Sequence, residues 1–187
     1  MAISNQRVKI VIHILSGVIA VLLLTILGLI IGTALTPARA GGGFNVTSPD
    51  IKDGGVLKDD FVFNEFGCTG KNISPALKWS GAPAGTSSFA ITAYDPDAPT
   101  GSGWWHWVVY NLPASSMGVP TGMGSGAVSL PKNANQGMND YGSVGYGGAC
   151  PPKGDKPHRY IFTVYALKVA RFDVPDRASP AMIGFNI

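Results

Sequence analysis

The hydrophobic residues of the chain fall into two patterns, one in the N-terminal leader and one in the remainder. Residues 10–38 contain no charged side chain, and most of this stretch is an almost continuous apolar run. As a helix with a rise of 1.5 Å per residue, such a run of about 26 residues exceeds the hydrocarbon thickness of a bilayer, about 30 Å. We therefore expect an N-terminal hydrophobic helix within residues 1–40, followed by a single domain at 41–187.

The residues around the apolar run predict its role. Arg7 and Lys9 precede it, which by the positive-inside rule holds the N-terminus in the cytoplasm and sends the rest of the chain across the membrane. Ala38, Arg39 and Ala40 resemble a signal-peptidase site, yet the apolar run is longer than an ordinary signal core of about 7 to 15 residues. Two alternatives follow, a cleaved signal peptide or a retained single transmembrane helix. Both predict an extracytoplasmic domain, in the periplasm or cell envelope.

After the leader, apolar residues recur in short runs that glycine and proline separate, which is typical of strands and turns. No apolar period of 3.6 residues is sustained between residues 41 and 171. This spacing predicts a mainly β domain of the β-sandwich kind. The stretch 48–60 holds one early strand at most, and the further predicted strands are 61–66, 76–79, 89–95, 106–112, 127–130 and 160–168.

The charge of the domain argues against one class of partner. Of the 14 Lys and Arg residues, Arg7, Lys9 and Arg39 lie in the leader, so the remaining 11 balance the 11 acidic residues, all of which follow it. A neutral domain without a basic stripe lacks the electrostatic footprint of a nucleic-acid binder. We therefore expect no nucleic-acid partner.

Cys68 and Cys150 are the two cysteines of the chain. They are compatible with one disulfide or with two unlinked buried thiols, and export favours the disulfide because extracytoplasmic compartments are oxidising. A bridge between them would close a loop of about 80 residues and stabilise the fold by about 4 to 5 kcal/mol on the chain-entropy model.

The two histidines after the leader, His106 and His158, each open a strongly apolar strand. A histidine at the start of a strand projects where loops converge and where a ligand can reach it. Alternation along the second strand places Tyr160 on the same face as His158, with Phe162 continuing that face inward. For either histidine alone, a strand cap that bonds the backbone is the more common explanation.

The first histidine follows a loop that proline stiffens. Pro96 and Pro99 fix the backbone around Asp95 and Asp97. One of these carboxylates can accept the N–H of an imidazole and raise its basicity, and a turn with a local Asp cap is the alternative. Three tryptophans beside the loop belong either to the core or to the rim of a ligand slot; they are Trp104, Trp105 and Trp107.

The second histidine follows a loop of similar character, GYGGACPPKGDKP at 145–157. Its glycines Gly145, Gly147 and Gly148 allow backbone N–H groups to turn inward as an anion nest, and Pro151 and Pro152 stiffen the segment after them. Because both histidines follow preformed loops, we expect the two loops to meet and to aim both imidazoles into one anion pocket.

Four segments together resemble a known family. They are FGCTGKNISPALKW at 66–79, DPDAP at 95–99, GWWHWVVYNLP at 103–113, and GYGGACPPKG followed by HRYIFTVYAL. In this order and separation they resemble the signature segments of the phosphatidylethanolamine-binding proteins, in particular the bacterial Raf-kinase-inhibitor-like branch. The resemblance extends from Ser48 to the C-terminus.

The resemblance implies two antiparallel sheets with a small cavity for phosphate-bearing head groups and similar anions. Members are binders and modulators of other proteins, including kinases and proteases, and are not established catalysts, so no cofactor is expected. The family usually continues beyond the segment resembling ASPAMIGFNI with a helix and a last strand, and we expect 41–187 to lack this end, with lowered stability or edge association. The positions that match the family's pocket are Asp95, His106, Pro151, His158 and Tyr160, with Gly148 beside them.

Three functions compete. The first is non-enzymatic binding of a phosphate-bearing or other small anionic ligand. The second is a metal-dependent hydrolase with Asp95, His106 and His158 as ligands. Its support is weak, because the chain has no HExxH motif and Glu65 is its one glutamate. A serine hydrolase has still weaker support, since no GxSxG motif is present. The third is an inhibitor or interaction module for a protease, a kinase or an envelope protein, which rests on the family analogy alone.

Overall fold

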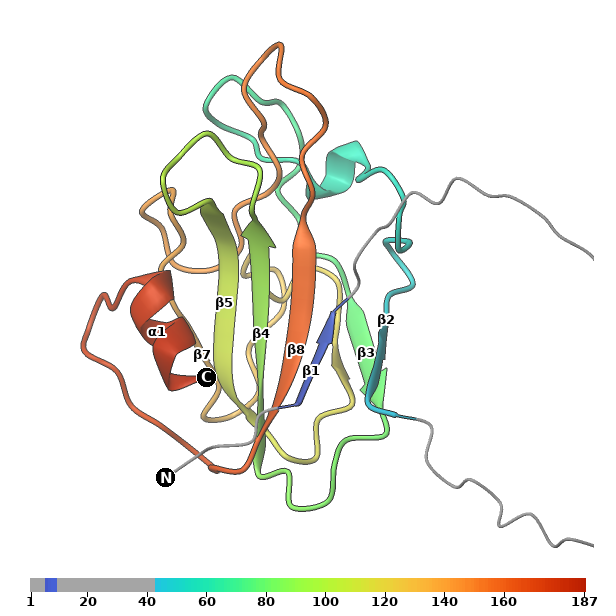
Figure 1. Cartoon of the computed structure of the whole chain (residues 1–187), viewed down its shortest axis with the longest axis vertical. Helices are drawn as coiled ribbons and strands as arrows, with labels where there is room; N and C mark the ends of the chain where they lie inside the picture. The colour runs from blue at the N-terminus through green and yellow to red at the C-terminus, as the bar shows by residue number, and fades with distance from the viewer. Residues whose placement is uncertain (1–5, 10–42) are drawn as a thin grey trace, which may run out of the picture.

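The computed structural model describes residues 6–9 and 43–187, and its strands form two antiparallel sheets (Figure 1). A short 3-10 helix, η1 (Asp59–Phe61), precedes β3, and α1 (Pro180–Asn186) ends the chain. In order across the first sheet, the five strands are β1 (Gln6–Lys9), β8 (Ile161–Leu167), β4 (Ser88–Asp95), β5 (Trp104–Pro113) and β7 (Asn135–Gln136). The second sheet holds β2 (Asn45–Thr47), β3 (Leu77–Ser80) and β6 (Gly118–Val119).

Most of the leader lies outside the described residues. The expected hydrophobic helix and the signal-peptidase site fall within residues 10–42, so both remain predictions. Residues 6–9 form β1, which pairs antiparallel with β8 at the edge of the larger sheet. In the described part of the chain, no helix combines the length and the apolar character that a membrane span requires.

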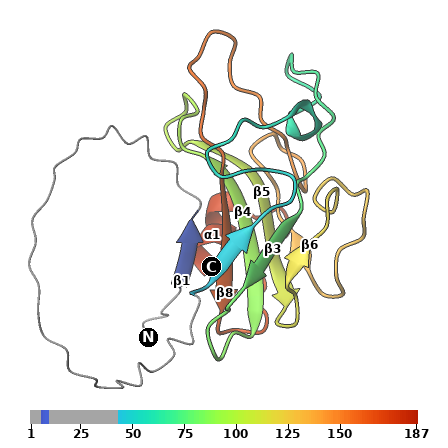
Figure 2. The same ribbon diagram turned by 90° about the vertical axis from the view of Figure 1, so that its right-hand side faces the viewer.

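The main hydrophobic core takes side chains from both sheets. β3 alternates buried and exposed residues, whereas β4 is buried on both faces because it lies between β5 and β8 and has packed layers on either side. Figure 2 shows the smaller sheet in front of the larger one. The fully buried members of this core include Leu77 on β3, Ile91 on β4, Trp107 and Val109 on β5, and Val164 on β8.

A second apolar cluster covers the other face of the larger sheet. There α1 packs Ile183 against Ala90 of β4 and Val108 of β5. The helix begins at a clear signal, because the Ser179 hydroxyl accepts the backbone N–H of Met182 and Pro180 occupies the first turn. Figure 1 shows α1 lying against the sheet beside β5 and β7.

A β-bulge in β5 sets the position of His106. Ala93 pairs with Trp107 and Tyr94 pairs with Trp105, so His106 is the extra residue without a partner on β4. Strict alternation would put Trp105 and Trp107 on one face. The bulge instead sends Trp107 into the main core and Trp105 to the cluster beneath α1. The bulge therefore takes His106 out of the regular alternation of β5.

The structure confirms four predicted strands and contradicts two. The predictions at 76–79, 89–95, 106–112 and 160–168 correspond to β3, β4, β5 and β8. The segment 61–66 is not a strand but leaves η1 as an irregular loop, in which the Phe63 N–H donates to the Ala149 carbonyl. The segment 127–130 is a bend, and the Ala127 N–H closes a turn on the Gly122 carbonyl. No strand lies at 48–60 either; β2 comes just before it.

Candidate ligand-binding site

A cavity of about 660 Å³ lies where β4 ends and β5 begins. The loops after β4 and before β8 both contribute to its wall, so the two stiff segments that carry the histidines do meet in space. His106 and His158 both line it, together with Asp95, Trp104, Tyr141, Pro151 and the Cys68–Cys150 disulfide.

Asp95 is the last residue of β4, and its carboxylate is held by three hydrogen bonds. Oδ1 accepts the backbone N–H groups of Asp97 at 2.8 Å and Ala98 at 3.1 Å, which closes the turn of the DPDAP segment. Oδ2 accepts the Nδ1–H of His158 at 2.7 Å. The structure therefore brings together both roles that the sequence left as alternatives, the local turn cap and the imidazole partner.

Asp97 does not line this cavity. Its carboxylate binds the guanidinium of Arg159 with distances of 2.6 and 2.8 Å and also accepts the Arg159 backbone N–H. The hydrogen bond from Arg159 lowers the pKa of Asp97 to about 2. This ion pair lies at the surface and joins the loop after β4 to the loop before β8, so it supports the site from outside.

His158 is nearly inaccessible, with 5% of its side chain exposed. Burial alone would lower the pKa of this imidazole, but the hydrogen bonds and negative charges of Asp95 and Asp155 raise it further than burial lowers it, and the net shift is upward. Its Nε2 lies 3.3 Å from Oδ2 of Asp155. His158 can therefore carry a positive charge at the cavity wall.

His106 is buried in a different state. Its Nδ1 lies 2.7 Å from the Gly147 carbonyl and 3.1 Å from the Gly148 carbonyl. Carbonyl oxygens only accept hydrogen bonds, so this network assigns the hydrogen to Nδ1 and leaves Nε2 with a lone pair. Burial lowers the pKa of His106, although the bond to Gly147 opposes the shift. The ring is therefore neutral near pH 7, with an acceptor at Nε2.

Three buried side-chain polar atoms have no hydrogen-bond partner within the described part of the chain, and all belong to this region. They are Trp104 Nε1, His106 Nε2 and the Tyr160 hydroxyl. A buried polar atom without a partner costs about 1 to 3 kcal/mol, and native proteins contain few of them. Three such atoms gathered at one end of the sheet indicate a site built to bond a polar ligand.

Tyr160 connects this cavity to a second one of about 290 Å³. As alternation predicts, His158, Tyr160 and Phe162 lie on one wall. This wall belongs to the second cavity, and of the three residues only His158 also lines the first. The Tyr160 ring meets the His106 ring edge to face, with centroids 5.1 Å apart. Burial raises the pKa of the Tyr160 phenol, and the nearby backbone of Cys150 opposes the shift.

The predicted anion nest is wrong, because the glycine N–H groups are already bonded. Gly145 donates to the Gly137 carbonyl at 3.1 Å, Gly147 donates to the His106 carbonyl at 2.8 Å, and Gly148 donates to Oδ1 of Asn72 at 2.7 Å. Gly148 acts on the site through its carbonyl, which accepts from His106. The loop therefore positions the imidazole and offers none of these three N–H groups to an anion.

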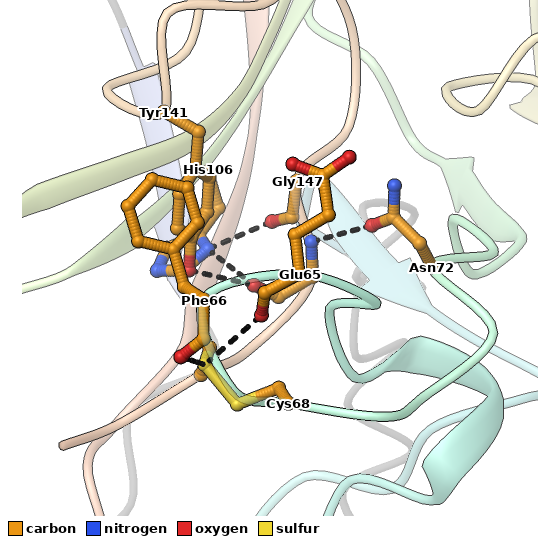
Figure 3. Close-up of a disulfide and its surroundings, with 9 residues drawn as sticks. Glu65, Phe66, Cys68, Asn72, His106, Tyr141 and Gly147 are labelled. Atoms are coloured by element: carbon orange, nitrogen blue, oxygen red, sulfur yellow. Dashed lines mark hydrogen bonds between the residues drawn. A yellow bond between two sulfur atoms is a disulfide. The ribbon is translucent and has the colours of Figure 1, made fainter.

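The disulfide forms part of the cavity wall. Cys68 and Cys150 are bonded, with their Cα atoms 5.9 Å apart, and Cys150 precedes Pro151, which lines both cavities. Figure 3 shows the bridge below the rings of Phe66 and His106. It ties the loop that contains Phe66 to the loop that contains Gly148, and these lie about 80 residues apart in sequence.

Sequence reasoning missed Tyr141. Its ring stacks on Phe63 with centroids 4.0 Å apart and meets His106 edge to face at 5.6 Å. Its hydroxyl donates to the Gly148 carbonyl at 3.1 Å, the same oxygen that accepts from His106 (Figure 3). Tyr141 lies in an irregular glycine- and asparagine-rich loop, where no periodic pattern could reveal its partners.

The three tryptophans divide between the two roles that the sequence left open. Trp104 lines the cavity, whereas Trp107 is in the main core and Trp105 packs beneath α1. Over residues 6–9 and 43–187, no group of three or more His, Cys, Asp or Glu side chains is placed to hold a metal ion.

Known proteins match both the sequence and the fold. The chain is 52% identical over 163 residues to the UPF0098 protein YbcL of Escherichia coli, covering 85% of this chain and 89% of YbcL. It is 57% identical over 140 residues to the UPF0098 protein YbhB of the same bacterium, covering 75% of this chain and 88% of YbhB. The crystal structure of YbcL, described as a new member of the mammalian PEBP family, superposes with a TM-score of 0.74 at 55% identity, over 76% of this chain and 88% of that chain.

A more distant relative comes from Mycobacterium tuberculosis. LppC, named as a candidate lipoprotein, is 38% identical over 138 residues, which cover 73% of this chain and 62% of LppC. The family model described as phosphatidylethanolamine-binding protein matches residues 47–187. The chain therefore belongs to the phosphatidylethanolamine-binding protein family.

Proposed function

We propose that the cavity between His106 and His158 binds a small phosphate-bearing or other anionic ligand without transforming it. One observation carries this proposal: two imidazoles from distant segments line one cavity, and the buried Nε2 of His106 has no partner. The alternative, histidines that cap strands by bonding the backbone, explains the Nδ1 bond of His106 to the Gly147 carbonyl. It explains neither the unpartnered Nε2 of His106 nor the bond of His158 to the Asp95 carboxylate.

The polar groups of the site match the needs of a phosphate. Protonated His158 supplies positive charge, and Trp104 Nε1 can only donate. His106 complements them in either of two ways. As a neutral ring it accepts a hydrogen bond from the hydroxyl of a phosphate monoanion. As an imidazolium it donates a hydrogen bond to a fully ionised phosphate oxygen. Binding in the second way requires that the ring take up a proton.

Asp95 acts through His158 in this proposal. Its two oxygens already accept three hydrogen bonds, so it does not compete with the ligand for the donors of the cavity. Its negative charge favours the protonated form of His158, and its hydrogen bond fixes the orientation of the ring. We assign it as a positioning residue.

Calorimetry with inorganic phosphate and phosphoethanolamine tests the proposal. Wild-type protein should bind both, and His106→Ala should weaken binding at least tenfold, about 1.4 kcal/mol. Lys71→Gln is the matched control, because it also removes a polar group but Lys71 lies outside the cavity in a surface pair with Asp60. No binding by wild type, or equal binding by His106→Ala, would refute the proposal.

We propose an extracytoplasmic location for the domain. Disulfides form and persist in oxidising compartments, and the Cys68–Cys150 bridge is part of the site. The relative LppC, named as a candidate lipoprotein, is consistent with the cell envelope. Alkylation of protein from a periplasmic extract should modify neither cysteine before reduction, and modification of both would contradict this location.

A further inference from the structure

The end of the larger sheet farthest from the ligand cavity brings three turns together. Ser88, the first residue of β4, pairs with Pro113 at the end of β5 and with Leu167 at the end of β8. A rise of about 3.3 Å per step along the eight residues of β4 puts this far end about 23 Å from Asp95 at the cavity wall. Figure 1 shows the turns of the far end at the bottom of the molecule, at residues 81–87, 114–117 and 168–170.

The chain enters the domain at this far end. Asn45, the first residue of β2, pairs with Ser80, which directly precedes the 81–87 turn. Phe44 is buried in the main core, and its ring centroid lies 6.1 Å from that of Phe89, the second residue of β4. The leader is therefore joined to the domain at the end opposite the cavity.

The length of the connection limits how the domain can face a membrane. The uncharged stretch of the leader ends at Ala38, and six residues, 39–44, lead from it to the fixed ring of Phe44. Fully extended, six residues span about 22 Å at most, and part of that length crosses the lipid head groups. The cavity lies about 23 Å beyond the far end. If the leader is retained as a transmembrane helix, this connection is too short for the cavity to open onto the same membrane.

The side chains of the far end are suited to an anionic lipid surface. No Asp or Glu lies within 78–88, 113–119 or 167–172, although acidic and basic residues balance over the whole domain. Arg171 pairs with Asp173, just beyond these segments. Cations near anionic lipids are attracted to the surface, and exposed apolar side chains can enter the head-group layer. The exposed side chains of both kinds are Lys78, Lys168, Arg171, Met117 and Val169.

We propose that the far end of the domain lies against the anionic surface of the membrane that holds the leader, and that the cavity opens away from it. The short connection and the absence of carboxylates select the lipid surface as the partner. The ligand then reaches the cavity from the aqueous compartment. In this orientation Gln6–Lys9 lie across the membrane from β8, so the orientation and the pairing of β1 with β8 exclude each other.

Quenching by lipid tests the orientation on the full-length protein. Because Cys68 and Cys150 are the only cysteines and are bonded, an added cysteine is a single labelling site. Met117→Cys carries a fluorophore at the far end, and Gly101→Cys carries one in the loop after β4, where a Cβ has nothing within 4 Å. The protein is placed in vesicles of phosphatidylglycerol and phosphatidylcholine with a nitroxide on the head groups. Since the labels are separated by about the length of β4, we expect at least twofold stronger quenching at Met117.

A pair of double variants tests the contribution of charge. A cation at an anionic surface strengthens binding by about fivefold, so Lys78→Gln with Lys168→Gln should reduce the difference in quenching between the two labels. The matched control is Lys58→Gln with Lys71→Gln, which removes the same charge beside η1, and it should leave the difference unchanged. Vesicles of phosphatidylcholine alone should reproduce the effect of the first double variant.

The topology of the leader is tested in spheroplasts that express the full-length chain. A membrane-impermeant thiol reagent should modify Gly101→Cys and should leave Gln6→Cys unmodified until detergent is added. Modification of Gln6→Cys in intact spheroplasts would put β1 on the same side as β8 and overturn the orientation. A mature protein that lacks residues 1–40 by mass spectrometry would overturn it as well.

These outcomes are distinct from those for ligand binding. Equal quenching at the two labels, or stronger quenching at Gly101, overturns the orientation. A difference that Lys78→Gln with Lys168→Gln leaves unchanged overturns the contact with anionic lipid. Phosphate affinity should be the same in vesicles and in detergent, and a loss of affinity in vesicles alone would mean that the membrane covers the cavity. Absence of phosphate binding in both refutes the proposed function and leaves the orientation standing.

Discussion

His158 donates its Nδ1–H to Oδ2 of Asp95 over 2.7 Å, and both side chains are about 95% inaccessible, with 5% and 4% exposed. This bond joins the end of β4 to the loop before β8. A buried charged pair is costly to break, because removal of one partner leaves the other charge uncompensated. The pair therefore fixes both the position and the charge of the imidazole at the cavity wall.

Asp95→Asn should lower the pKa of His158. The amide oxygen can still accept the N–H groups of Asp97 and Ala98, but its NH₂ group faces Nδ1 and carries no charge. Histidine titration by NMR measures the shift directly. Asp173→Asn is the control, because Asp173 pairs with Arg171 at the surface and lines neither cavity, and it should leave the His158 pKa close to the wild-type value. An unchanged pKa in Asp95→Asn would contradict the assigned role of Asp95.

The same pair should stabilise the fold in a defined pH window. The pKa of folded His158 lies above the ordinary value of about 6.5, so its contribution is complete below pH 6.5 and is lost as the pH rises through the folded pKa. The difference in unfolding free energy between wild type and Asp95→Asn should be larger at pH 6 than at pH 9. A difference in unfolding free energy that grows with pH would contradict this prediction.

Sulfate binding should strengthen as the pH falls. Sulfate carries no proton to donate to the Nε2 lone pair of His106, so the ring must become protonated to bind it well. Burial lowers the pKa of free His106, and a bound anion raises it. The titratable groups near this ring include Asp95, Asp140, Tyr141 and Tyr160, and neither tyrosine ionises in this range. His158 lines the same cavity, and its protonation as the pH falls strengthens anion binding in the same direction. Calorimetry from pH 8 to 5 should show rising affinity; a flat profile would contradict proton uptake.

Loss of the disulfide should weaken both the fold and the site. Cys68→Ser with Cys150→Ser frees a loop of about 80 residues, which on the chain-entropy model costs about 4 to 5 kcal/mol of unfolding free energy. Because Cys150 precedes Pro151 in the cavity wall, phosphate affinity should fall as well. Denaturant unfolding of oxidised and reduced wild type provides an independent comparison. Equal midpoints for oxidised, reduced and variant protein would contradict the structural role.

Gly148→Ala should damage the site by a steric mechanism. A Cβ at Gly148 would lie 2.5 Å from the Phe63 backbone nitrogen and 2.6 Å from the Phe61 carbonyl, and backbone atoms cannot easily give way. We expect a loss of about 1 to 3 kcal/mol in stability, together with weaker phosphate binding as His106 loses its acceptor geometry. Gly101→Ala, which adds a Cβ with nothing within 4 Å, is the matched control. Wild-type stability in Gly148→Ala would show that the loop moves freely.

Periodicity predicts β3, β4, β5 and β8 because their apolar residues alternate or run continuously in the core. The same reasoning fails at 61–66, where the pattern FVFNEF resembles a strand. There Phe61 and Phe63 are buried by the loop around Gly148, and the backbone bonds that loop, not a neighbouring strand. Local alternation reports which side chains are buried but not what pairs with the backbone.

The site, like the fold, is predictable from the sequence only in part. The histidines could be found because each opens an apolar strand after a stiff loop, and Asp95 because two prolines hold it. The bulge at His106 could not be predicted from the sequence, because it depends on the register between β4 and β5. The anion nest was wrong because the Gly148 N–H is taken by Asn72, a side chain 76 residues away in sequence. Tyr141 was missed for the same reason, since its partners come from distant segments.

The most direct test of the account is the ¹⁵N signal of the His106 Nε2 during a phosphate titration near pH 7. In the free protein this nitrogen should carry a lone pair while Nδ1 is protonated, because two carbonyls accept from Nδ1. At saturation the Nε2 signal should move toward that of a hydrogen-bonded or protonated nitrogen. If it stays unchanged while phosphate is bound, the ligand lies elsewhere and the proposed site is wrong.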